Sequence, residues 1–442
     1  MNIHDPKLID DFILGGALGR EYSRSKSPNF LERCAAEGRW LDSRLNAGVD
    51  PYQCFTTGRG GPRVSRANRG GVAQEGINFG SQDYLSLSTH PALIRAAGEA
   101  AHAYGVHSAG SAGLAGLLDI TLKLETELAA FLGYRDVTLF PIGWAAGYGV
   151  ITSLIRPTDH IIIDRLAHAC LQEGSRNATK NTHISAHLSV EAVEKKLQQI
   201  RAGDPDSGIL VVTETLFSMD SDVADIAALQ SLCHQYGATL LVDCAHDLGA
   251  VGETGRGYLE LQNMIGEVDI LMGSFSKTFA SNGGFVACNE PGMKARLRGG
   301  CGPSTFTNAM TPLQVAVIRR ALSIVDSEEG QRRRASLAEN TLLLRRLLEN
   351  AGFETRGEPS AIVPVMFGQV AKARLATRYA TDAGAFVNLI ETPAVPKNAC
   401  RWRLQVMADH TKNDIEEFVE IAIQAREMAG RHLSARAVED SR

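Results

Sequence analysis

The chain has 442 residues, of which 44% are hydrophobic and 21% are charged, and its formal net charge is -5. This balance is typical of a folded protein, and the length suits one large domain with a smaller one. A mildly acidic chain lacks the charge that coats nucleic acid or attracts a protein to a membrane surface. We therefore expect chemistry on small molecules and no nucleic-acid partner.

The first residues, MNIHDPKLIDDFILGG, lack a basic segment followed by a long apolar core. No stretch reaches the roughly 20 apolar residues that a membrane-spanning helix needs. The 8 cysteines stand singly, without a CxxC pair or a Cys/His cluster at metal-ligand spacing. The sequence predicts a cytoplasmic protein with reduced thiols, no integral membrane segment and no metal site.

Residues 1–75 predict an N-terminal helical and hairpin segment. Residues 29–48, NFLERCAAEGRWLDSRLNAG, have a helical pattern. Residues 56–71, TTGRGGPRVSRANRGG, contain turn-forming glycines and no acid between Arg59 and Arg69. Two interpretations stay open for this arginine-rich stretch: a solvated hairpin or loop, or an arm that faces an anion such as a phosphopantetheine chain.

Short apolar runs alternate with helix-like segments over residues 76–310. The runs are VTLFPIG, HIIID, GILVVTETLF, ATLLVDCAH, DILMGSFSK and GGFVAC. Because these runs do not alternate with polar residues, they are typical of parallel strands buried on both faces of a sheet. We expect a large α/β domain here.

The remainder of the chain predicts a smaller α+β domain over residues 311–430. It begins with one long helical stretch from Pro312, continues with the strands AIVPVMFG and RWRLQVMA, and closes with an amphipathic helix from Lys412. Residues 431–442 are expected to form a polar tail.

Polar residues follow several of the apolar runs, and ligands of open α/β sheets bind at the carboxyl ends of strands. These residues are His168, Ser218, Asp243, His246, Ser274 and Lys277. Each alone has a structural explanation, such as a helix cap, a buried histidine or a surface lysine. Together they supply an acid for a ring nitrogen, a flat imidazole, an imine-forming lysine and hydroxyls for a phosphate, which are the parts that pyridoxal phosphate requires.

The pattern assigns these groups to parts of that cofactor. Asp243 would keep the pyridine nitrogen protonated, and Lys277, partly desolvated, would act first as a nucleophile and then as a base. The amides of Gly143 and Trp144 begin a predicted helix, where a phosphate dianion can bind. Ser274, three residues before Lys277, would hydrogen-bond the same phosphate.

Four motifs carry a resemblance to a known family: FSMDSDVADI, VDCAHDLGAVGETGRG, SFSKTF and PAVPKNACRWRLQVMADHT. From about residue 30 to 425 the chain resembles the α-oxoamine synthases, fold-type I pyridoxal-phosphate enzymes that include 8-amino-7-oxononanoate synthase. Segments such as CGPSTFTNAMTP are most similar to bacterial serine palmitoyltransferases. The resemblance implies an aspartate aminotransferase-like fold with a mainly parallel seven-stranded sheet and a smaller α+β C-terminal domain.

The resemblance also implies residue roles. His168 would stack on the cofactor ring and touch the substrate carboxylate, and Ser218 and His246 would lie near the phenolic oxygen. Thr307 would reach the phosphate of a neighbouring subunit, which implies a homodimer with shared active sites. Arg401 would grip the amino acid's carboxylate, a role that suits a bidentate donor; the alternative is a surface arginine on a strand.

The implied reaction is a decarboxylative Claisen condensation. A small amino acid (serine, alanine or glycine) displaces Lys277, which then removes the Cα proton. The carbanion attacks an acyl thioester of coenzyme A or an acyl carrier protein, and loss of carbon dioxide gives an α-amino ketone. An aminotransferase, a lyase or a non-catalytic partner subunit are the alternatives; the GETGRG segment and the motif around Arg401 oppose the first two, and the presence of Lys277 opposes the third.

Four positions depart from the family pattern. Ala112 replaces an arginine, Thr121 a histidine, Gln82 an asparagine and Ser86 a glycine. These changes fall around the expected acyl entrance, so we expect the cofactor chemistry to be retained and the acyl donor to differ. One hypothesis is a carrier-bound donor, whose phosphate or acidic surface the arginine-rich stretch would meet.

Overall fold

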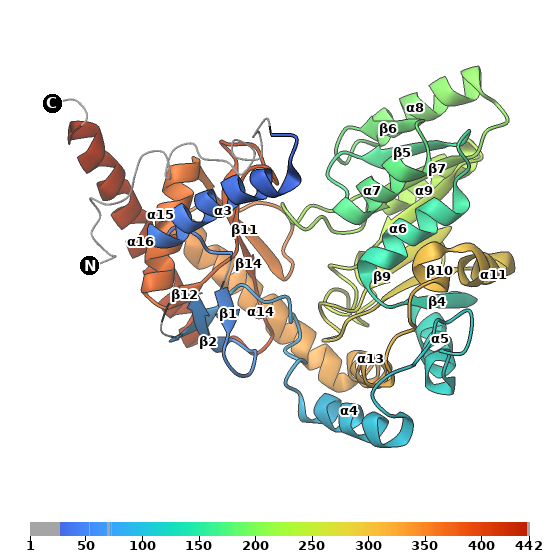
Figure 1. Ribbon diagram of the computed structural model, residues 1–442, viewed down its shortest axis with the longest axis horizontal. Helices are drawn as coiled ribbons and strands as arrows, with labels where there is room; N and C mark the ends of the chain where they lie inside the picture. Colours follow the sequence, from blue (N-terminus) through green and yellow to red (C-terminus); the bar gives the residue numbers. More distant parts are fainter. Residues whose placement is uncertain (1–26, 53, 69–70, 72, 440–442) are drawn as a thin grey trace. The chain divides into compact units, whose positions relative to one another are not determined.

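The computed structural model describes residues 27–52, 54–68, 71 and 73–439. The chain divides into two compact units, which are described separately (Figure 1). The central unit comprises residues 82–338. The terminal unit comprises the described residues of 1–81 and 339–442.

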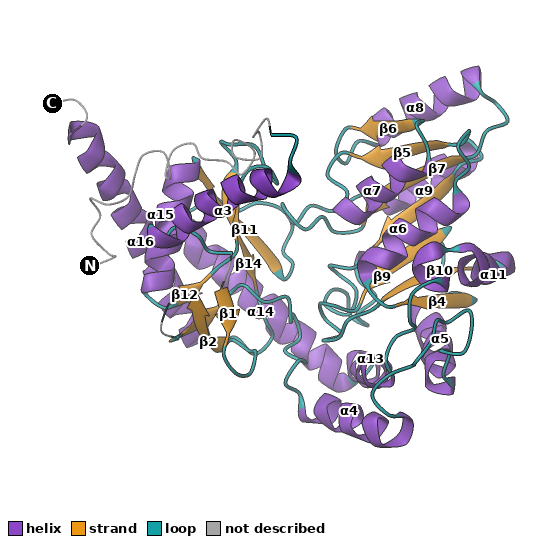
Figure 2. Cartoon of the chain, in the orientation of Figure 1, coloured by secondary structure: helices purple, strands orange, loops and turns teal. Residues whose placement is uncertain are grey.

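The central unit is built on a seven-stranded sheet with the order β4-β10-β9-β8-β7-β5-β6 (Figure 2). The strands are β4 (Asp136–Phe140), β5 (His160–Asp164), β6 (Thr182–Ser185), β7 (Ile209–Glu214), β8 (Thr239–Asp243), β9 (Ile270–Ser274) and β10 (Gly284–Cys288). Only β10 runs antiparallel to its neighbours, β4 and β9. The predicted mainly parallel seven-stranded sheet is confirmed.

Helices precede, connect and follow these strands along the chain. They are α4 (Pro91–Tyr104), α5 (Asp119–Leu132), α6 (Gly143–Leu154), α7 (Ala169–Ala178), α8 (Val190–Gly203), α9 (Ile226–Gln235), α10 (Tyr258–Leu261), α11 (Pro291–Gly300), α12 (Gly302–Thr305) and α13 (Pro312–Val325). Every residue of β7 is buried, as expected for a strand covered on both faces. α6 packs closely on α7, because a Cβ at Gly147 would lie 2.7 Å from the sulfur of Cys170.

The terminal unit is α+β, as predicted for the C-terminal part. One sheet has the order β1-β2-β3-β12 and another has the order β11-β14-β13. The strands are β1 (Cys54–Thr56), β2 (Arg63–Asn68), β3 (Gln74–Asn78), β11 (Ile362–Gly368), β12 (Ala385–Phe386), β13 (Leu389–Ile390) and β14 (Cys400–Gln405). The helices are α3 (Phe30–Asn46), α15 (Val370–Asp382) and α16 (Lys412–Glu439). A further helix, α14 (Glu328–Asn350), belongs to the central unit up to Ala338 and to the terminal unit from Glu339.

Three expectations need correction. The single helical stretch from Pro312 is two helices, since the Ser327 hydroxyl bonds the Ile324 carbonyl at 2.6 Å where α13 ends. Residues 431–439 continue α16 instead of forming a polar tail, because they contain good helix formers and neither Gly nor Pro; residues 440–442 lie outside the described chain. Strand β6 was not predicted, because its sequence THIS is short, polar and half-exposed at the sheet edge.

The compact units divide the chain differently from the predicted domain boundaries. α13 packs against α4 and α5 in the central unit, although the smaller domain was predicted to begin at residue 311. Residues 27–81 group with the C-terminal part, because β3 pairs with β12. A division of the sequence into contiguous segments cannot predict that strands from distant parts of the chain pair with each other.

The arginine-rich stretch forms part of an antiparallel hairpin, in which β1 pairs with β2. The Arg63 guanidinium is 2.7 Å from Asp414 and also binds Glu417, and Arg66 donates to the Pro51 carbonyl at 3.2 Å. Arg69 lies outside the described residues. These two arginines therefore serve the fold of the terminal unit, although Arg63 is exposed, as Arg59 is.

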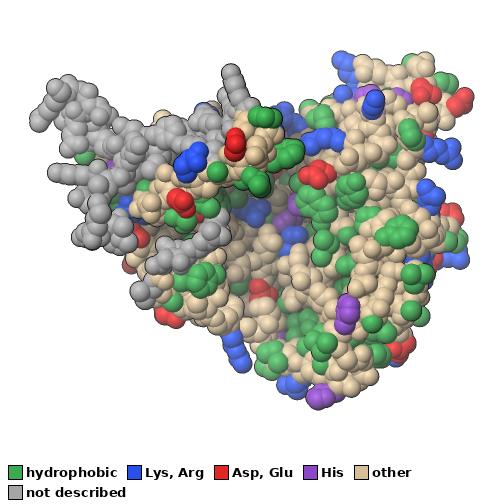
Figure 3. Space-filling model, viewed as in Figure 1, with side chains coloured by type: hydrophobic (Ala, Val, Ile, Leu, Met, Phe, Trp, Pro, Cys, Tyr) green, Lys and Arg blue, Asp and Glu red, His purple; other side chains and the backbone are tan. Residues whose placement is uncertain are grey.

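The surface carries interspersed charges. In the view of Figure 3, basic and acidic side chains lie among one another and do not gather by sign. Within the described part of the chain, no helix has both the length and the apolar run needed to cross a membrane.

Candidate active site

The strand order brings three predicted site residues to one edge of the central sheet. The carboxyl ends of β5, β7, β8 and β9 are neighbours there. Asp243 ends β8, Lys277 follows the end of β9 by three residues, and His168 follows the end of β5 by four. Lys277 and His168 both act electrostatically on Asp243, so the three groups form one cluster.

Asp243 is a buried acceptor, with 6% of its surface exposed. Its Oδ1 accepts a hydrogen bond of 2.9 Å from the Ala245 backbone N–H. Burial raises the pKa of Asp243, and its electrostatic interactions with Lys277 and His168 oppose that rise. The protonated ring nitrogen of a bound cofactor would place a positive charge beside this carboxylate. Asp243 therefore suits a pyridinium ring.

Sequence reasoning missed a second buried acid, Glu214. It ends β7, is 3% exposed and pairs in register with Asp243 on β8. Its Oε1 accepts a short hydrogen bond from the backbone N–H of His168. Burial, reinforced by the charge of Asp243, raises the pKa of Glu214 well above its usual range. The signal was available, because Glu214 ends an apolar run just as Asp243 does.

His168 caps the first turn of α7 and presents an exposed imidazole. Its Nδ1 accepts from the Cys170 backbone N–H at 3.3 Å. The Trp144 indole meets the imidazole edge to face, with ring centroids 5.9 Å apart and an interplanar angle of 74°. Both the backbone and the side chain of His168 are therefore fixed, while its ring stays accessible to a flat ligand.

His246 is held by Tyr84, the other residue that sequence reasoning passed over. The Tyr84 hydroxyl lies 3.0 Å from His246 Nδ1, and which of the two donates depends on the imidazole tautomer. Tyr84 is completely buried and His246 is 7% exposed. This hydrogen bond fixes the orientation of the imidazole.

An anion cradle forms where α6 begins. Ile142 precedes the helix and gives no side-chain cap, so the first amide groups of α6 can serve a ligand. A Cβ at Gly143 would lie 2.5 Å from the Ser274 hydroxyl, so only glycine leaves this space. The hydroxyls of Ser274 and Ser276 are 2.8 Å apart beside it. Amides and two hydroxyls are donors that suit a phosphate dianion.

Three other predicted residues lie on other segments of the chain. Ser218 is half-buried in the loop after β7. Thr307 is exposed, and its hydroxyl donates to the Pro303 carbonyl at 2.6 Å. Arg401 belongs to the terminal unit, on β14. The interpretation of Arg401 as a surface arginine is wrong, because its side chain is only 3% exposed.

Two of the departures from the family pattern share one small cavity. Ala112 and Thr121 both line a space of about 10 Å³, together with Ser304 and Arg298. The Thr121 hydroxyl is buried and meets no hydrogen-bond partner among the described residues. A third departure, Ser86, takes a left-handed φ of 55°, where the glycine of the family pattern would carry no strain.

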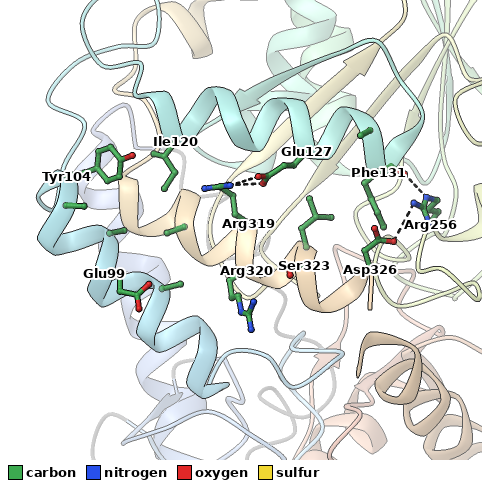
Figure 4. Close-up of a pocket in the computed structure, with 16 residues that line it drawn as sticks. Glu99, Tyr104, Ile120, Glu127, Phe131, Arg256, Arg319, Arg320, Ser323 and Asp326 are labelled. Carbon is green, nitrogen blue, oxygen red and sulfur yellow. Dashed lines mark hydrogen bonds and ion pairs between the residues drawn. The ribbon is translucent and has the colours of Figure 1, made fainter. Parts of the chain in front are cut away.

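A larger cavity of about 820 Å³ lies elsewhere in the central unit, along α4, α5 and α13 (Figure 4). Four of its charged groups are engaged with one another: Arg319 forms two hydrogen bonds to Glu127, and Arg256 lies 3.6 Å from Asp326. The predicted site residues do not line it. The volume of a cavity therefore does not identify the candidate active site of this protein.

Comparisons with known proteins identify the family. The family model for aminotransferase class I and II matches residues 74–421. 8-Amino-7-oxononanoate synthase of Geobacter sulfurreducens is 36% identical over 339 residues, which cover 77% of this chain and 86% of that protein. Serine palmitoyltransferase of Bacteroides ovatus is 35% identical over 378 residues, or 86% of this chain and 93% of the relative. The chain belongs to the α-oxoamine synthase family.

Solved structures of α-oxoamine synthases agree with this assignment. Serine palmitoyltransferase of S. paucimobilis, with a bound PLP–myriocin aldimine, has a TM-score of 0.85 at 28% identity and covers 91% of this chain and 99% of its own. The serine palmitoyltransferase of Sphingomonas wittichii gives the same values. This α-oxoamine synthase is thus a pyridoxal-phosphate-dependent acyltransferase with a fold-type I architecture.

Proposed function

We propose that this α-oxoamine synthase condenses serine, alanine or glycine with an acyl thioester and releases carbon dioxide, the free thiol and an α-amino ketone. The observation that carries the proposal is the cluster of Asp243, Lys277 and His168 at the carboxyl edge of the sheet. The similarity to relatives named 8-amino-7-oxononanoate synthase and serine palmitoyltransferase supports it.

The cofactor would be held at both ends by groups of the central unit. The N-terminus of α6 at Gly143 and the hydroxyl of Ser274 would bind the phosphate. Asp243 would hold the proton-bearing ring nitrogen, and the exposed imidazole of His168 would lie against the ring. When bound, pyridoxal phosphate supplies an electron sink for the charge that develops at the substrate Cα.

Three further side chains would act on the Cα proton and on the phenolic oxygen of the cofactor. Lys277 is half-buried and would carry the Cα proton on its Nζ. His246, oriented by Tyr84, would place a ring nitrogen near the phenolic oxygen, and Ser218 would lie near the same oxygen.

The amino acid's carboxylate would bind Arg401, a buried guanidinium whose Nε already donates to the Ala399 carbonyl at 3.1 Å. The acyl donor would be a thioester of coenzyme A or of an acyl carrier protein. Arg63 and Arg66 are engaged within the terminal unit, so Arg59 is the exposed arginine among the described ones of this stretch that lacks such a role and would meet the carrier. Equal turnover of free and carrier-bound acyl donors would refute it.

We propose a homodimer in which Thr307 reaches the partner's phosphate. Phe306, beside Thr307, is 86% exposed, and Leu114 is 85% exposed. The bridge between Ser111 and Asn308 brings the two segments together, and exposed apolar side chains that lie together mark interaction sites. The cytoplasmic location expected from the sequence stays a prediction.

An absorbance titration tests the proposal. Purified protein with added pyridoxal phosphate should show a visible band that shifts when the preferred amino acid is added. Lys277→Ala should lack that band, and the exposed Lys180→Ala should keep it. If the wild-type protein gives no band with the cofactor, the proposed function fails.

A further inference from the structure

His187 lies between two carboxylates near the carboxyl edge of the central sheet. It occupies the loop that follows β6 and precedes α8. Its Nδ1 is 2.9 Å from Asp164 Oδ1, and its Nε2 is 2.9 Å from Asp222 Oδ2. Because ionised carboxylates only accept hydrogen bonds, both ring nitrogens donate, and the ring is an imidazolium.

The Asp164 side of this bridge shapes the turn that presents His168. Asp164 is the last residue of β5, and its Oδ1 also accepts from the Leu166 backbone N–H at 2.8 Å. The Asp164 carbonyl accepts from the Ala167 N–H at 3.1 Å. His168 follows directly. The position of His168 therefore depends on how the Asp164 carboxylate is held.

The Asp222 side shapes the turn that presents Ser218. This turn is residues 216–223, whose ends form a β-bridge, and the Phe217 N–H donates to the Asp222 carbonyl at 2.9 Å. The Phe217 ring meets the His187 ring edge to face, with centroids 4.6 Å apart. His187 thus contacts both sides of the turn that carries Ser218.

The topology explains why this residue can reach both turns. β6 is the edge strand, β5 is next to it and β7 is third. A loop that leaves β6 must cross the end of β5 to reach the loop after β7. We infer that His187 is a positioning residue that joins the turn of His168 to the turn of Ser218, and this role rests on the proposed function because both residues are assigned to the cofactor site.

The charge state suits such a bridge. Burial lowers the pKa of His187, but hydrogen bonds and the charges of Asp164 and Asp222 outweigh this and raise the pKa to about 9. A neutral imidazole would donate from one nitrogen only and would release one of the two turns. His187 therefore donates both hydrogen bonds at neutral pH.

Hydrogen exchange of the cofactor-free protein tests the bridge without reference to activity. His187→Gln should make the amides of residues 165–168 and 216–223 exchange about tenfold faster, the effect of losing one charged hydrogen bond. The control is His183→Gln on β6, the strand that precedes His187; the His183 Nε2 lies 3.0 Å from His160 Nδ1. Faster exchange in both turns for His187→Gln alone supports the bridge, and unchanged exchange in either turn overturns it.

Cofactor binding tests the consequence of the bridge. His187→Gln should raise the dissociation constant of pyridoxal phosphate about tenfold, as loss of an outer-shell partner does in metal sites, and should alter the visible circular dichroism of the bound cofactor. Asp222→Asn, which keeps the Asp164 bond, should give a smaller change in the same direction, and His183→Gln should match the wild type.

The outcomes separate the two proposals. A wild-type dissociation constant and dichroism in both His187→Gln and Asp222→Asn would overturn the positioning role while leaving the proposed function intact. Failure of the wild-type protein itself to bind pyridoxal phosphate would overturn the proposed function, and the positioning role with it. If His187→Gln does not fold, Asp222→Asn alone decides the question.

Discussion

Glu214 and Asp243 face each other in register on adjacent parallel strands, and both carboxyl side chains are buried. Two acids so placed cannot both carry a full negative charge at low cost, and the pKa of each is raised, chiefly by burial. Glu214 nonetheless binds the backbone of His168, so it also supports the candidate site.

Glu214→Gln should stabilise the cofactor-free protein at high pH. A carboxyl with a raised pKa holds its proton more tightly when folded, so the stability of the wild type falls as the pH rises above the ordinary carboxyl range. Glutamine keeps an acceptor for His168 and has no charge to bury. Thermal midpoints at pH 5 and pH 8 should show an advantage of the variant that grows with pH. Glu173→Gln on the exposed face of α7 is the control, and an equal gain there would contradict the explanation.

Asp243→Asn should reduce kcat/KM by about 100-fold or more, because the fixed charge that would face the ring nitrogen is lost. Steady-state release of free thiol from the acyl donor measures this. The exposed Asp206→Asn should retain wild-type activity. A fall of less than tenfold in kcat/KM for Asp243→Asn would contradict the role proposed for Asp243.

Gly143→Ala should weaken cofactor binding, because the added methyl group would lie 2.5 Å from the Ser274 hydroxyl and fill the cradle. We expect at least a tenfold rise in the dissociation constant of pyridoxal phosphate, measured by absorbance. Gly98→Ala is a matched control: its Cβ meets nothing within 4 Å, and it should stabilise α4 by about 1 kcal/mol. Equal binding by both variants would show that the cradle does not hold the phosphate.

His187 should make the stability of the cofactor-free protein depend on pH. Its folded pKa is about 9 against an ordinary 6.5, and Asp164 and Asp222 are the charged groups that face it. The stabilisation is complete below the ordinary value and disappears as the pH rises through 9; the shift corresponds to about 3 kcal/mol. The thermal midpoint of the wild type should fall over this interval more than that of His187→Gln. Parallel curves for the two proteins would contradict the assignment.

Ser86→Gly should stabilise the protein by about 1 kcal/mol, because a non-glycine residue at a φ of 55° is strained. Chemical denaturation of the cofactor-free protein measures this change. Ser88→Gly, two residues away and exposed, should be neutral or destabilising. A loss of stability in Ser86→Gly would mean that the serine side chain makes contacts worth more than the strain.

Local signals predicted the sheet and part of the site. β7, β8 and β9 are apolar runs in sequence, and the polar residues that end or follow them mark the carboxyl edge where Asp243 and Lys277 lie. β6 escaped prediction because an edge strand buries little and its sequence is polar.

The remaining parts of the site depend on contacts between distant segments. Tyr84 reaches His246 across 162 positions, and His187 reaches Asp222 across 35. No local pattern marks such partners. Glu214 differs, because the rule that identified Asp243 also applied to it and was not used.

The most direct test of the central claim follows the substrate carboxyl carbon. Enzyme loaded with pyridoxal phosphate is incubated with carboxyl-labelled serine, alanine or glycine, with and without an acyl thioester, and labelled carbon dioxide and free thiol are measured together. The proposed condensation predicts one carbon dioxide for each thiol released, only when both substrates are present, and none from Lys277→Ala. A keto acid formed without carbon dioxide would contradict it and would indicate an aminotransferase.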